Sequence, residues 1–569
     1  MRLFRFFLLT SFLFGLGFVA LAQPQDVFER VEAQCPELPK GLLRAIAFTN
    51  TQCHHLTDAD YASPADDPQA MPRAYGMMGL VRDGKGCFRE NLKTVAALSG
   101  FPEDAILSDP EVNVLAYAKA CVRLAEQYGI DRKSPEAFIP VIEALSELPS
   151  GTPKDVLPMK MMLYSVYEML GADLPALFGA DYETLSAQGL SFEKGPDYAP
   201  ALWVPAPECN YSQRTNPVSA VVIHYTEGSY AGCISWFQNC DSQVSAHYVI
   251  RSHDGQVTQM VREADKAWHA RSANAYTIGI EHEAYGDVAS FFTPEMYASS
   301  ADLIRDICSR YEAIDGYRTF YTDTLDDGTA LNTGVWDLGG EGACLRIRGH
   351  QHYPGQTHTD PGPYWDWNYY YKLINEGTPV VSLGGPGVSS GVLNHVNYGD
   401  DERCIWVVTS DVNTSISLQF SRFELERDGD FLWIYDGADV YAPKLGRWNT
   451  QSPGRVTSSS NAMCIEFRSD CQETDSGWKA VWTASDNSAV GDSQLDGVAV
   501  VQRGDELLLR VPDEGRYEVL LADLLGRVLL QQRFSGTVSL GLGGLAQGTY
   551  LIRYTRLSDG ASAVKRIIR

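Results

Sequence analysis

An apolar run that ends in a histidine, Ala220-Val221-Val222-Ile223-His224-Tyr225-Thr226, opens the stretch on which the rest of the chain depends. The motifs that follow it are Ser245-Ala246-His247-Tyr248, Ala267-Trp268-His269-Ala270, Ile278-Gly279-Ile280-Glu281, Arg348-Gly349-His350 and His358-Thr359-Asp360-Pro361-Gly362. Most of the chain's eleven histidines fall here, several at the ends of predicted strands. Histidines gathered at strand ends, with acids close by, indicate a metal site or an acid/base site.

The residues around these motifs predict an α/β domain. The continuous apolar run from Val221 to Tyr225 is typical of a buried strand, and Val244 to Ile250 alternates so that His247 and Tyr248 face opposite sides. Thr293 to Arg310 has the apolar spacing of an amphipathic helix. Because strands alternate with helices, we expect a mixed sheet covered by helices.

The length and net charge of the chain limit the classes of protein to which it can belong. The chain has 569 residues, enough for several domains, and its 44% apolar content is ordinary for globular protein. Its formal net charge is −26, whereas a protein that binds nucleic acid needs a basic face for the phosphates. The composition therefore argues against nucleic acid as a partner and disfavours docking on anionic membranes.

The N-terminus has the pattern of a signal peptide over residues 1–22. Its parts are the basic start Arg2 and Arg5, the apolar run Phe6 to Val19 and the cleavage site Ala20-Leu21-Ala22. That run is short for a membrane span, and no later stretch is apolar enough to cross a bilayer. Export makes disulfides expected among the twelve cysteines. Cys233 and Cys240 are the easiest pair to propose, and the remaining connectivity stays open.

Residues 23–190 are predicted to be helical. Asp109-Pro110-Glu111 begins one helix, which Gly129 ends. Ser134-Pro135-Glu136 begins another, with serine as the N-cap and proline at the first helical position. Met159 to Leu170 forms a further helix.

Three motifs in this helical region occur in a familiar order and spacing: Leu42-Leu43-Arg44-Ala45-Ile46-Ala47, Ala74-Tyr75-Gly76-Met77-Met78-Gly79-Leu80 and Asp109-Pro110-Glu111-Val112-Asn113-Val114. They resemble the lysozyme-like lytic transglycosylases. That family places its catalytic glutamate shortly after the first motif, where this chain has Asn50. An amide cannot donate a proton to a glycosidic oxygen, so the resemblance implies a non-catalytic, glycan-binding form of the fold. An unrelated helical domain is the alternative.

Residues 377–391 are rich in Gly, Ser and Pro and predict a linker, whereas residues 392–485 are all strand and turn. The second region contains Cys404-Ile405-Trp406, Asp430-Phe431-Leu432-Trp433-Ile434-Tyr435-Asp436-Gly437, Phe467-Arg468-Ser469-Asp470 and Gly477-Trp478. These motifs resemble a CUB domain, which implies a β-sandwich used for binding. The family's calcium ligands would correspond to Glu426, Asp430 and Asp470. Because two usual cysteines are absent and the loop before Asp430 is short, a solvated acidic loop is favoured over a calcium site.

A second polar linker, residues 486–497, leads to a small all-β unit, residues 498–569. This unit contains Leu521 to Val528, Leu545 to Ile552 and the terminal Lys565-Arg566-Ile567-Ile568-Arg569. These segments resemble the type IX secretion sorting domain of Bacteroidetes. The resemblance implies a second C-terminal β-sandwich, read by an outer-membrane translocon, and a protein that passes through the periplasm to the cell surface or the medium. A carbohydrate-binding or fibronectin-like module is the alternative.

The motifs of the central stretch together resemble the zinc-dependent N-acetylmuramoyl-L-alanine amidases, a family that includes the peptidoglycan-recognition proteins. The resemblance covers most of residues 215–375, within a domain that we expect over residues 197–376. It implies one zinc ion held by His224, His350 and Asp360. Two imidazoles and one carboxylate leave a fourth position for water, which is typical of a catalytic zinc site.

The same resemblance assigns the acid/base residues. Glu281 corresponds to the family's catalytic glutamate, which takes a proton from water and passes it to the leaving amine. Ile278 and Ile280 share one face of their strand, so Glu281 lies on the other. Two residues before Asp360, where many members carry lysine, this chain has His358, whose ring N–H would stabilise the oxyanion.

Other polar and aromatic residues of the stretch are assigned to substrate binding or to the structure around the site. We expect the substrate to be bound by Tyr225, His247, Trp268 and His269. Packing beside the site is the alternative for His247, and a structural role is the alternative for His269. His352 is expected at the surface.

These observations predict a secreted hydrolase that cuts the amide between N-acetylmuramic acid and the L-alanine of the stem peptide. Its partner would be peptidoglycan or muropeptides. A non-catalytic peptidoglycan-binding receptor or an adhesin on the same fold is the alternative. Such receptors typically lose a zinc ligand, and this chain keeps all three, which favours catalysis.

Overall fold

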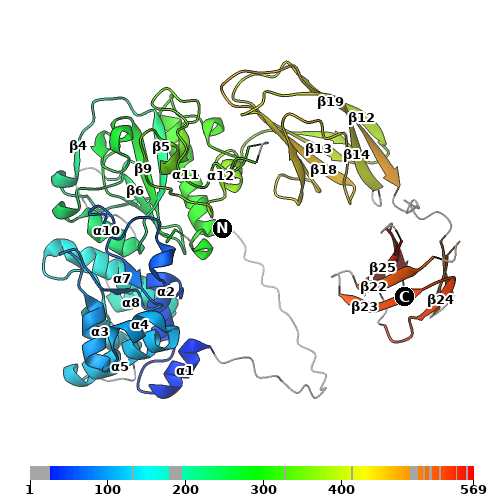
Figure 1. The fold of residues 1–569 in the computed structure, drawn as a ribbon. Helices are drawn as coiled ribbons and strands as arrows, with labels where there is room; N and C mark the ends of the chain where they lie inside the picture. Colours follow the sequence, from blue (N-terminus) through cyan, green and yellow to red (C-terminus); the bar gives the residue numbers. More distant parts are fainter. Residues whose placement is uncertain are drawn as a thin grey trace.

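The computed structural model describes residues 26–130, 134–178, 195–286, 288–325, 328–411, 414–486, 498–503, 506–511, 515–523, 527–545, 548–558 and 562–568. A helical domain lies beside a central domain that contains a sheet, and a β-sandwich follows the central domain (Figure 1). The predicted signal peptide and nearly all of the second predicted linker lie outside the described residues. Within the described residues, no helix combines the length and the apolar character that crossing a membrane requires.

The helical domain forms where the sequence predicts it. Its elements are α1 Val27–Gln34, α2 Leu42–Thr51, η1 Asp58–Asp60, β1 Ala74–Tyr75, β2 Leu80–Val81, α3 Asn91–Ser99, α4 Glu103–Ser108, α5 Pro110–Tyr128, η2 Pro135–Phe138, α6 Ile139–Leu145, η3 Pro153–Asp155, α7 Val156–Met169 and α8 Leu174–Phe178. The side chain of Asp109 accepts hydrogen bonds from the first turn of α5, and Gly129 ends that helix in the left-handed conformation. The predicted start and end of α5 are therefore confirmed.

The helical domain and the central domain share one hydrophobic core. Helix α7 packs against α10 (Tyr230–Phe237) of the central domain, and Met161 and Met162 lie in the same buried cluster as Tyr230 and Ile234. Polar contacts cross the same boundary, such as the hydrogen bond from Gln52 Nε2 to Ser252 Oγ of 2.7 Å. Because apolar burial is the dominant stabilising term, this shared core fixes the two domains against each other.

The central domain contains the predicted mixed sheet with helices. Its strands are β3 Leu202–Trp203, β5 Ala220–Tyr225, β6 Tyr248–Ile250, β7 Val257–Gln259, β9 Thr277–His282 and β10 Ile347–Gly349. In the described residues they follow the order β10-β5-β9-β6-β7-β3, with β10, β5, β9 and β6 parallel and β7 antiparallel to β6. Every residue of β5 and β9 is buried, which explains why their apolar runs are nearly continuous.

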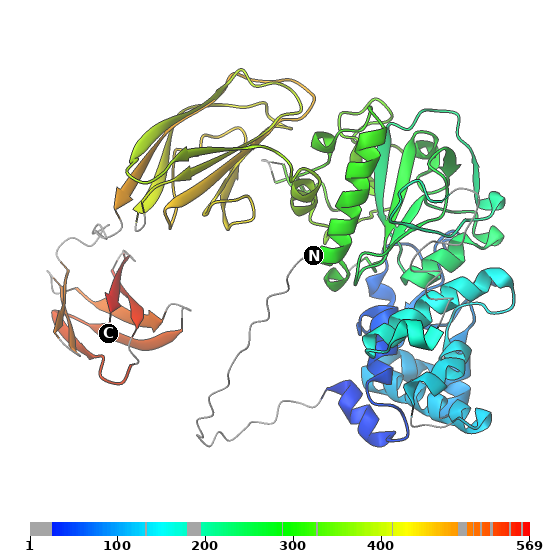
Figure 2. The ribbon, with the colours of Figure 1, turned by 180° about the vertical axis from the view of Figure 1, so that it is seen from behind.

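Helices cover both faces of this sheet. Helices α11 (Pro294–Arg310) and α12 (Trp367–Ile374) pack against the face that carries Tyr248 and Ile250, whereas α10 packs against the face that carries Val249 (Figure 2). The predicted alternation is therefore confirmed within β6, whereas Val244 and Ala246, which precede the strand, lie in the cluster of Val249 and not in that of Tyr248. The remaining short elements are β4 Tyr211–Gln213, which pairs with β8 Asp265–Ala267, and the 3-10 turns η4 Glu208–Asn210, η5 Cys240–Ser242, η6 Arg271–Ala275, η7 Ala289–Phe291, η8 Gly316–Arg318 and η9 His350–His352.

The next domain is a sandwich of two sheets. Its strands are β11 Val380–Gly384, β12 Ser390–Val396, β13 Arg403–Thr409, β14 Thr414–Glu424, β15 Phe431–Tyr435, β16 Lys444–Trp448, β17 Arg455–Thr457, β18 Ala462–Arg468 and β19 Gly477–Asp486. The sheet orders are β11-β13-β18-β15-β16 and β12-β19-β14-β17 in the described residues.

The predicted linker over residues 377–391 is wrong for about half of its length. Strand β11 occupies its first half and pairs in parallel with β13, and β12 begins at Ser390. The glycines and serines of this segment obscured the run Val380-Val381-Ser382-Leu383, whose β-branched residues suit a strand. The positive φ of Gly384 turns the chain at the end of β11.

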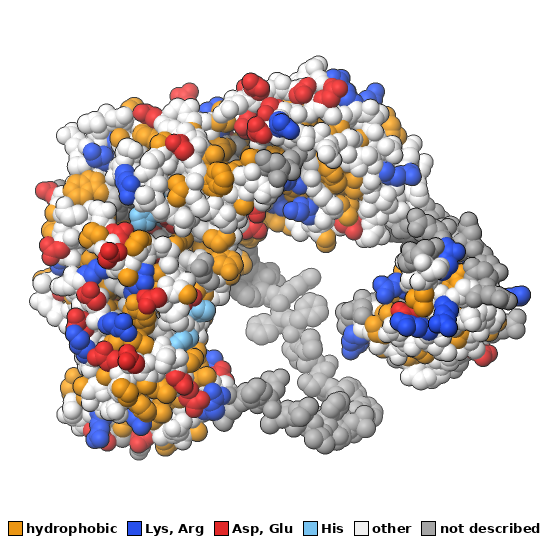
Figure 3. Space-filling view, viewed as in Figure 1, with side chains coloured by type: hydrophobic (Ala, Val, Ile, Leu, Met, Phe, Trp, Pro, Cys, Tyr) orange, Lys and Arg blue, Asp and Glu red, His pale blue; other side chains and the backbone are white. Residues whose placement is uncertain are grey.

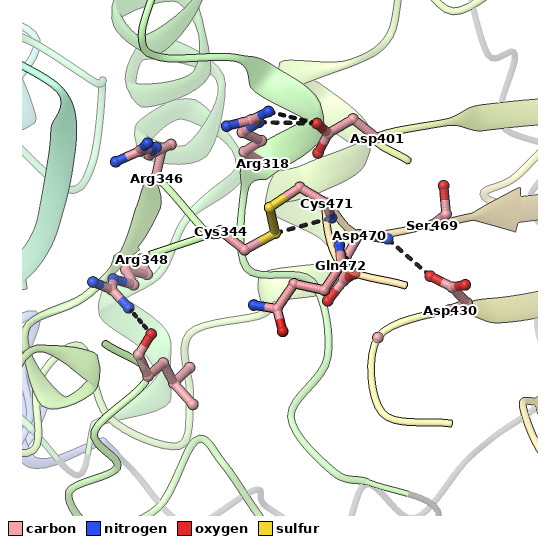
Figure 4. Close-up of a disulfide and its surroundings, with 12 residues drawn as sticks. Arg318, Cys344, Arg346, Arg348, Asp401, Asp430, Ser469, Asp470, Cys471 and Gln472 are labelled. Carbon is pink, nitrogen blue, oxygen red and sulfur yellow. Dashed lines mark hydrogen bonds and ion pairs between the residues drawn. A yellow bond between two sulfur atoms is a disulfide. The ribbon is translucent and has the colours of Figure 1, made fainter. Parts of the chain in front are cut away.

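A disulfide and buried charges join the sandwich to the central domain. Cys344 of the central domain is bonded to Cys471 of the sandwich, and beside them Arg318 pairs with Asp401 at 2.8 Å (Figure 4). Deeper in the interface lie the charged side chains of Arg403, Glu466 and Arg468, with Nε to Oε1 distances to Glu466 of 2.7 and 3.0 Å.

These charges also contact the central domain directly. Arg403 donates a hydrogen bond to the Asn375 carbonyl at 2.5 Å, and the guanidinium of Arg468 lies 4.0 Å from the ring centroid of Tyr371. Burial alone would raise the pKa of Glu466, but Arg468 and Arg403 outweigh it and lower that pKa to about 2. Glu466 is therefore ionised and fully paired at neutral pH.

Another disulfide lies within the central domain, and it does not join the two cysteines that the sequence analysis paired. Cys209 is bonded to Cys240, whereas Cys233 is a free, buried thiol in α10. Cys233 lies inside α10, whereas Cys240 lies in η5 after that helix has ended at Phe237. The proposed Cys233–Cys240 pair is therefore wrong, because Cys233 points from the helix into the core.

The C-terminal unit is all-β, as predicted. Its strands are β20 Ala499–Arg503, β21 Glu506–Arg510, β22 Tyr517–Asp523, β23 Val528–Phe534, β24 Thr537–Gly541, β25 Thr549–Arg556 and β26 Ser562–Ile568. In the described residues they form the sheets β20-β21-β24 and β23-β22-β25-β26 around one core. Parts of the three segments that resemble a sorting domain lie outside the described residues: Leu524 to Gly526, Ala546 to Gln547 and Arg569.

Charged side chains are interspersed on the face of the molecule shown in Figure 3. Acidic and basic groups alternate there over the helical and central domains.

Removal of Glu466 should destabilise the joined central and sandwich domains. Glu466→Ala leaves two arginines buried without their anion, which costs about 3 to 5 kcal/mol. Glu424→Ala is the matched control, because Glu424 is exposed and its ion pair with Arg422 lies in solvent, where such pairs contribute little to stability. Denaturant unfolding followed by tryptophan fluorescence measures both, and equal midpoints in the two variants would contradict the assigned role.

Candidate active site

Three neighbouring parallel strands bring the predicted site residues to one edge of the central sheet. In the register of β5 and β9, His224 pairs with Glu281, and in that of β10 and β5, Gly349 pairs with Ile223. His350 directly follows β10, so it lies next to His224. Carboxyl ends of parallel strands are where α/β sheets place their ligands.

The three predicted metal ligands meet at this edge. His224 Nδ1 lies 2.7 Å from Asp360 Oδ2, and His350 Nδ1 lies 3.0 Å from Asp360 Oδ1. The three residues are 3%, 6% and 7% exposed, and one ligand atom from each lies within 4.8 Å of the others. The structure therefore gathers two imidazole nitrogens and a carboxylate in one buried place.

Gln356 determines which ring nitrogen of His350 carries the proton. Its amide nitrogen donates to the backbone carbonyl of Ala270 at 3.0 Å, so its oxygen faces His350 Nε2 at 2.8 Å. Because a carbonyl oxygen only accepts, His350 Nε2 is the donor. The lone pair of the neutral ring is then on Nδ1, which faces Asp360.

A second chain of hydrogen bonds orients His224 in the same way. Thr277 Oγ1 donates to the Ala273 carbonyl at 2.8 Å, so it accepts from His269 Nε2 at 3.3 Å. His269 Nδ1 is then an acceptor, and His224 Nε2 donates to it at 2.9 Å. His224 Nδ1 therefore also presents a lone pair to Asp360.

This donor set fits a divalent cation. Two lone pairs facing two carboxylate oxygens repel one another unless a positive charge lies between them. Burial, which is only partly offset by Asp360, lowers the pKa of His224 to about 4, so the ring is neutral at neutral pH. Burial would raise the pKa of Asp360, but whenever His350 or His224 carries a proton that effect is outweighed and the pKa is held low, so the carboxyl stays ionised. Neutral imidazoles and an ionised carboxylate are the protonation states that zinc requires.

Glu281 lies beside the three predicted metal ligands, and one of its carboxyl oxygens is not used in a hydrogen bond within the described residues. Its side chain is nine-tenths buried, and Oε2 has no hydrogen-bond partner among the described residues. Burial, together with the carboxylates of Asp360 and Glu227, raises its pKa well above the ordinary value. A buried carboxyl with a raised pKa next to a metal-binding set is typical of a group that takes up and releases a proton.

A cleft of about 260 Å³ opens onto these residues. Tyr225, Trp268, His269 and His358 line it, so four residues predicted to act in catalysis or substrate binding face the same space. His358 stacks on His350, with ring centroids 5.2 Å apart and planes within 9°. Residues of the helical domain line the opposite side, from Ala62 to Met71.

Two histidines lie elsewhere than predicted. His247 is fully buried behind the site, where Nδ1 accepts from Gly279 N at 2.9 Å and Nε2 donates to the Asp265 carbonyl at 3.2 Å, so its predicted contact with substrate is wrong and the packing alternative holds. His352 is also fully buried, and its ring packs on Phe320 with centroids 4.3 Å apart, so its predicted place at the surface is wrong. Both errors arise because strand and turn periodicity does not show what a neighbouring element covers.

Asn50, at the position of the lysozyme-like glutamate, lies against the central domain. Its side-chain nitrogen donates to the Met78 carbonyl at 3.0 Å, and its own carbonyl accepts from the hydroxyl of Tyr285 at 3.2 Å. It is 8% exposed. The position is thus part of the packing between two domains.

The three acidic residues predicted as a solvated loop lie close together in the sandwich. Oxygens of Glu426, Asp430 and Asp470 lie within 4.8 Å of one another, and Asp430 is fully buried. Burial, with Asp470 and Glu426 nearby, raises the pKa of Asp430 to about 8, although hydrogen bonds from Tyr398 and Asp470 lower it. Since a buried carboxylate is not solvated, that interpretation is wrong for Asp430.

Comparison with known proteins agrees with this geometry. Residues 214–363 match the family model described as N-acetylmuramoyl-L-alanine amidase. The chain is 43% identical over 189 residues to N-acetylmuramoyl-L-alanine amidase A of Achromobacter lyticus, which covers 32% of this chain and 97% of that relative. The chain belongs to the N-acetylmuramoyl-L-alanine amidase family. The predicted enzyme class is therefore confirmed.

The sandwich of this amidase has relatives of its own. Residues 389–482 match the CUB domain model, which confirms the predicted CUB-like region. The chain is 30% identical over 132 residues to human cubilin, covering 22% of this chain and 4% of cubilin. The solved catalytic domain of PlyG overlaps 31% of this chain and 93% of its own length, at 14% identity and a TM-score of 0.21.

Sequence reasoning missed two features of the amidase site. Gln356 lies in the turn between two predicted ligands, and the only signal for it was an amide side chain between His350 and His358. The residues from Ala62 to Met71 carry no motif, because their place in the cleft comes from the packing of another domain.

Loss of the Gln356 amide should weaken metal binding. Gln356→Ala frees the His350 ring to rotate and to change tautomer, and partners of this kind are worth about 10- to 100-fold in metal affinity. Zinc titration against a competing chelator measures the change, with Gln213→Ala, an exposed glutamine of β4, as the control. Unchanged affinity in Gln356→Ala would show that the amide does not orient the ligand.

Proposed function

We propose that this amidase is a secreted, zinc-dependent peptidoglycan hydrolase that cleaves the amide between N-acetylmuramic acid and the L-alanine of the stem peptide. The observation that supports it best is the pair of Nδ1 lone pairs, from His224 and His350, aimed at the carboxylate of Asp360. When bound there, zinc supplies an acidified water and polarises the scissile carbonyl.

Glu281 carries out the proton transfers in this proposal. Its buried Oε2 is available to take a proton from the attacking water, and the raised pKa makes it a stronger base than an exposed glutamate. The same oxygen then delivers that proton to the nitrogen of L-alanine as the amide bond breaks. Without this transfer the leaving group would depart as an unstable amide anion.

The residues that line the cleft hold the substrate. His358 lies one third exposed at the rim, where a ring N–H can stabilise the oxyanion that forms on the carbonyl. Trp268 and Tyr225 offer aromatic surface to the sugar or the peptide, and His269 also orients His224. A non-catalytic receptor would have no use for the unpartnered Glu281 beside three intact ligands.

Two segments of the sequence support a route by which the protein reaches its substrate. The signal-peptide pattern of residues 1–22 and the sorting-domain resemblance of residues 498–569 support export through the periplasm, with an outer-membrane type IX translocon as the partner. A cell-wall amidase joined to a CUB domain fits an extracellular or cell-surface site of action. The helical domain, with Asn50 packed against its neighbour, acts in this scheme without cutting glycan.

Substitution of Glu281 distinguishes the role of general base from that of metal ligand. Glu281→Gln should keep one zinc per chain and lose about 10²- to 10⁴-fold in kcat, because an amide cannot accept the water's proton. His350→Ala should lose both zinc and activity. Elemental analysis and muropeptide hydrolysis measure the two effects, with Glu295→Gln, an exposed glutamate of α11, as the control. Near wild-type turnover in Glu281→Gln, or full zinc content in His350→Ala, would refute the assigned roles.

We also propose that the CUB domain holds one calcium ion at Glu426, Asp430 and Asp470. Oxygen ligands of this kind are what calcium prefers. The support is the buried Asp430 carboxyl and its neighbour Asp470, because a cation there would compensate the burial that raises their pKa values to about 8 and about 6.

Calcium should therefore stabilise the full-length protein. At about 100 times the dissociation constant, binding contributes about 2.7 kcal/mol, which raises the midpoint of thermal unfolding. Asp430→Asn should abolish the rise, whereas Asp428→Asn, an exposed acid in the same loop, should retain it. An equal response to calcium in the two variants, or none in the wild type, would count against the site.

A further inference from the structure

One wall of the catalytic cleft comes from the helical domain. The residues of that domain that line the cleft are Ala62, Ser63, Pro64, Asp67, Gln69, Ala70 and Met71. They belong to one segment between η1 and β1, which we call the cleft segment. The same space is lined by the ligands His224, His350 and Asp360, so substrate that reaches the metal site passes along this segment.

Residues of the central domain hold the start and the middle of the cleft segment through its backbone. The carboxylate of Glu227 accepts hydrogen bonds from the backbone nitrogens of Ala62 and Ser63 at 2.7 and 3.0 Å. The indole nitrogen of Trp236 donates to the Gln69 carbonyl at 3.1 Å. Because these bonds use backbone atoms, the side chains of the segment stay available to the cleft.

Close packing fixes the end of the segment. Met71 is buried against α10, and a Cβ at Gly228 would lie 2.4 Å from Met71 Cε. A larger residue at Gly228 would therefore force the end of the Met71 side chain to move. Inside the helical domain, Lys85 Nζ donates to the Ala70 carbonyl at 2.7 Å. The wall is thus preformed, and binding needs little ordering of it.

Asp67 is the charged group that this wall presents to the site. Its Oδ1 accepts from Gln69 N at 2.8 Å, and its Oδ2 lies 3.9 Å from Nε2 of His358 across the cleft. That separation is too long for a hydrogen bond, and the Asp67 side chain is one fifth exposed. A carboxylate oxygen is therefore open to a donor from a molecule in the cleft.

We propose that the cleft segment is a substrate-binding wall, in which Asp67 accepts hydrogen bonds from N–H or O–H groups of a muramyl peptide held at the metal site. This inference rests on the proposed function. It assigns the helical domain a part in specificity, because the central domain alone has an incomplete cleft. Donors on the sugar and donors on the stem peptide share this chemistry.

Exchange of Asp67 tests the hydrogen bonds. Asp67→Asn retains an oxygen for Gln69 N and removes the charge, so KM should rise about tenfold while kcat stays within about twofold. Asp66→Asn is the matched control, because Asp66 is the exposed neighbour that does not line the cleft, and it should leave KM unchanged. Equal KM values in the two variants, or a loss confined to kcat, would overturn the binding role.

A bulky side chain tests the wall itself. Ala62→Trp should fill the cleft and lower kcat/KM by at least tenfold with full zinc content, whereas Ala65→Trp should have no effect. Ala62 and Ala65 are both exposed, and only Ala62 lines the cleft. Similar kcat/KM values for the two tryptophan variants would overturn the proposal.

A comparison of two substrates shows which part of the muramyl peptide donates hydrogen bonds to Asp67. A KM increase in Asp67→Asn that is the same for N-acetylmuramoyl-dipeptide and for disaccharide tetrapeptide supports the proposal with donors near the muramoyl group. An increase seen only with the longer substrate supports it with donors on the added sugar or the later stem residues. An inactive, zinc-loaded wild type would instead contradict the proposed function, whereas an active wild type with unaffected Asp67→Asn and Ala62→Trp would contradict only this inference.

Discussion

The parallel register of β10, β5 and β9 is the constraint on which the site depends. It places His350, His224 and Glu281 at the carboxyl ends of three adjacent strands. Neighbouring strands in a sheet lie about 4.8 Å apart. A shift of one residue in β9 would turn Glu281 to the opposite face of the sheet. Packing on both faces opposes that shift, because an isoleucine of β9 would then replace Gly279 against the ring of His269, where even a Cβ would lie 2.6 Å from ring atoms.

Hydrogen bonds that lead away from the cleft complete the site. Gln356 and His269 each hold one histidine in the tautomer that leaves Nδ1 free, and both are held by backbone or hydroxyl groups behind them. The neighbouring domains add rigidity of another kind. The helical domain shares a core with α10, and the CUB domain is bonded through Cys344 and Cys471, so the central sheet is supported from two sides.

The sequence allowed the ligands and the base to be predicted because each stands in or next to a motif at the end of a strand. His224, Glu281 and His350 were accessible in this way, and the structure brings them together. Features that depend on packing between distant segments were not accessible. The burial of His247, the free thiol of Cys233 and the placement of Asp67 in the cleft are set by neighbours more than 25 residues away in the chain or by another domain.

Mass spectrometry of a peptidoglycan digest tests most directly whether the site of His224, His350 and Asp360 cleaves the muramoyl–alanine amide. Zinc-loaded full-length protein should release stem peptides with a free L-alanine amino terminus and leave glycan strands that keep their lactyl groups. A chelator should stop this release, and added zinc should restore it. Amide cleavage that persists after zinc removal, or products with new reducing ends and intact amides, would contradict the assignment.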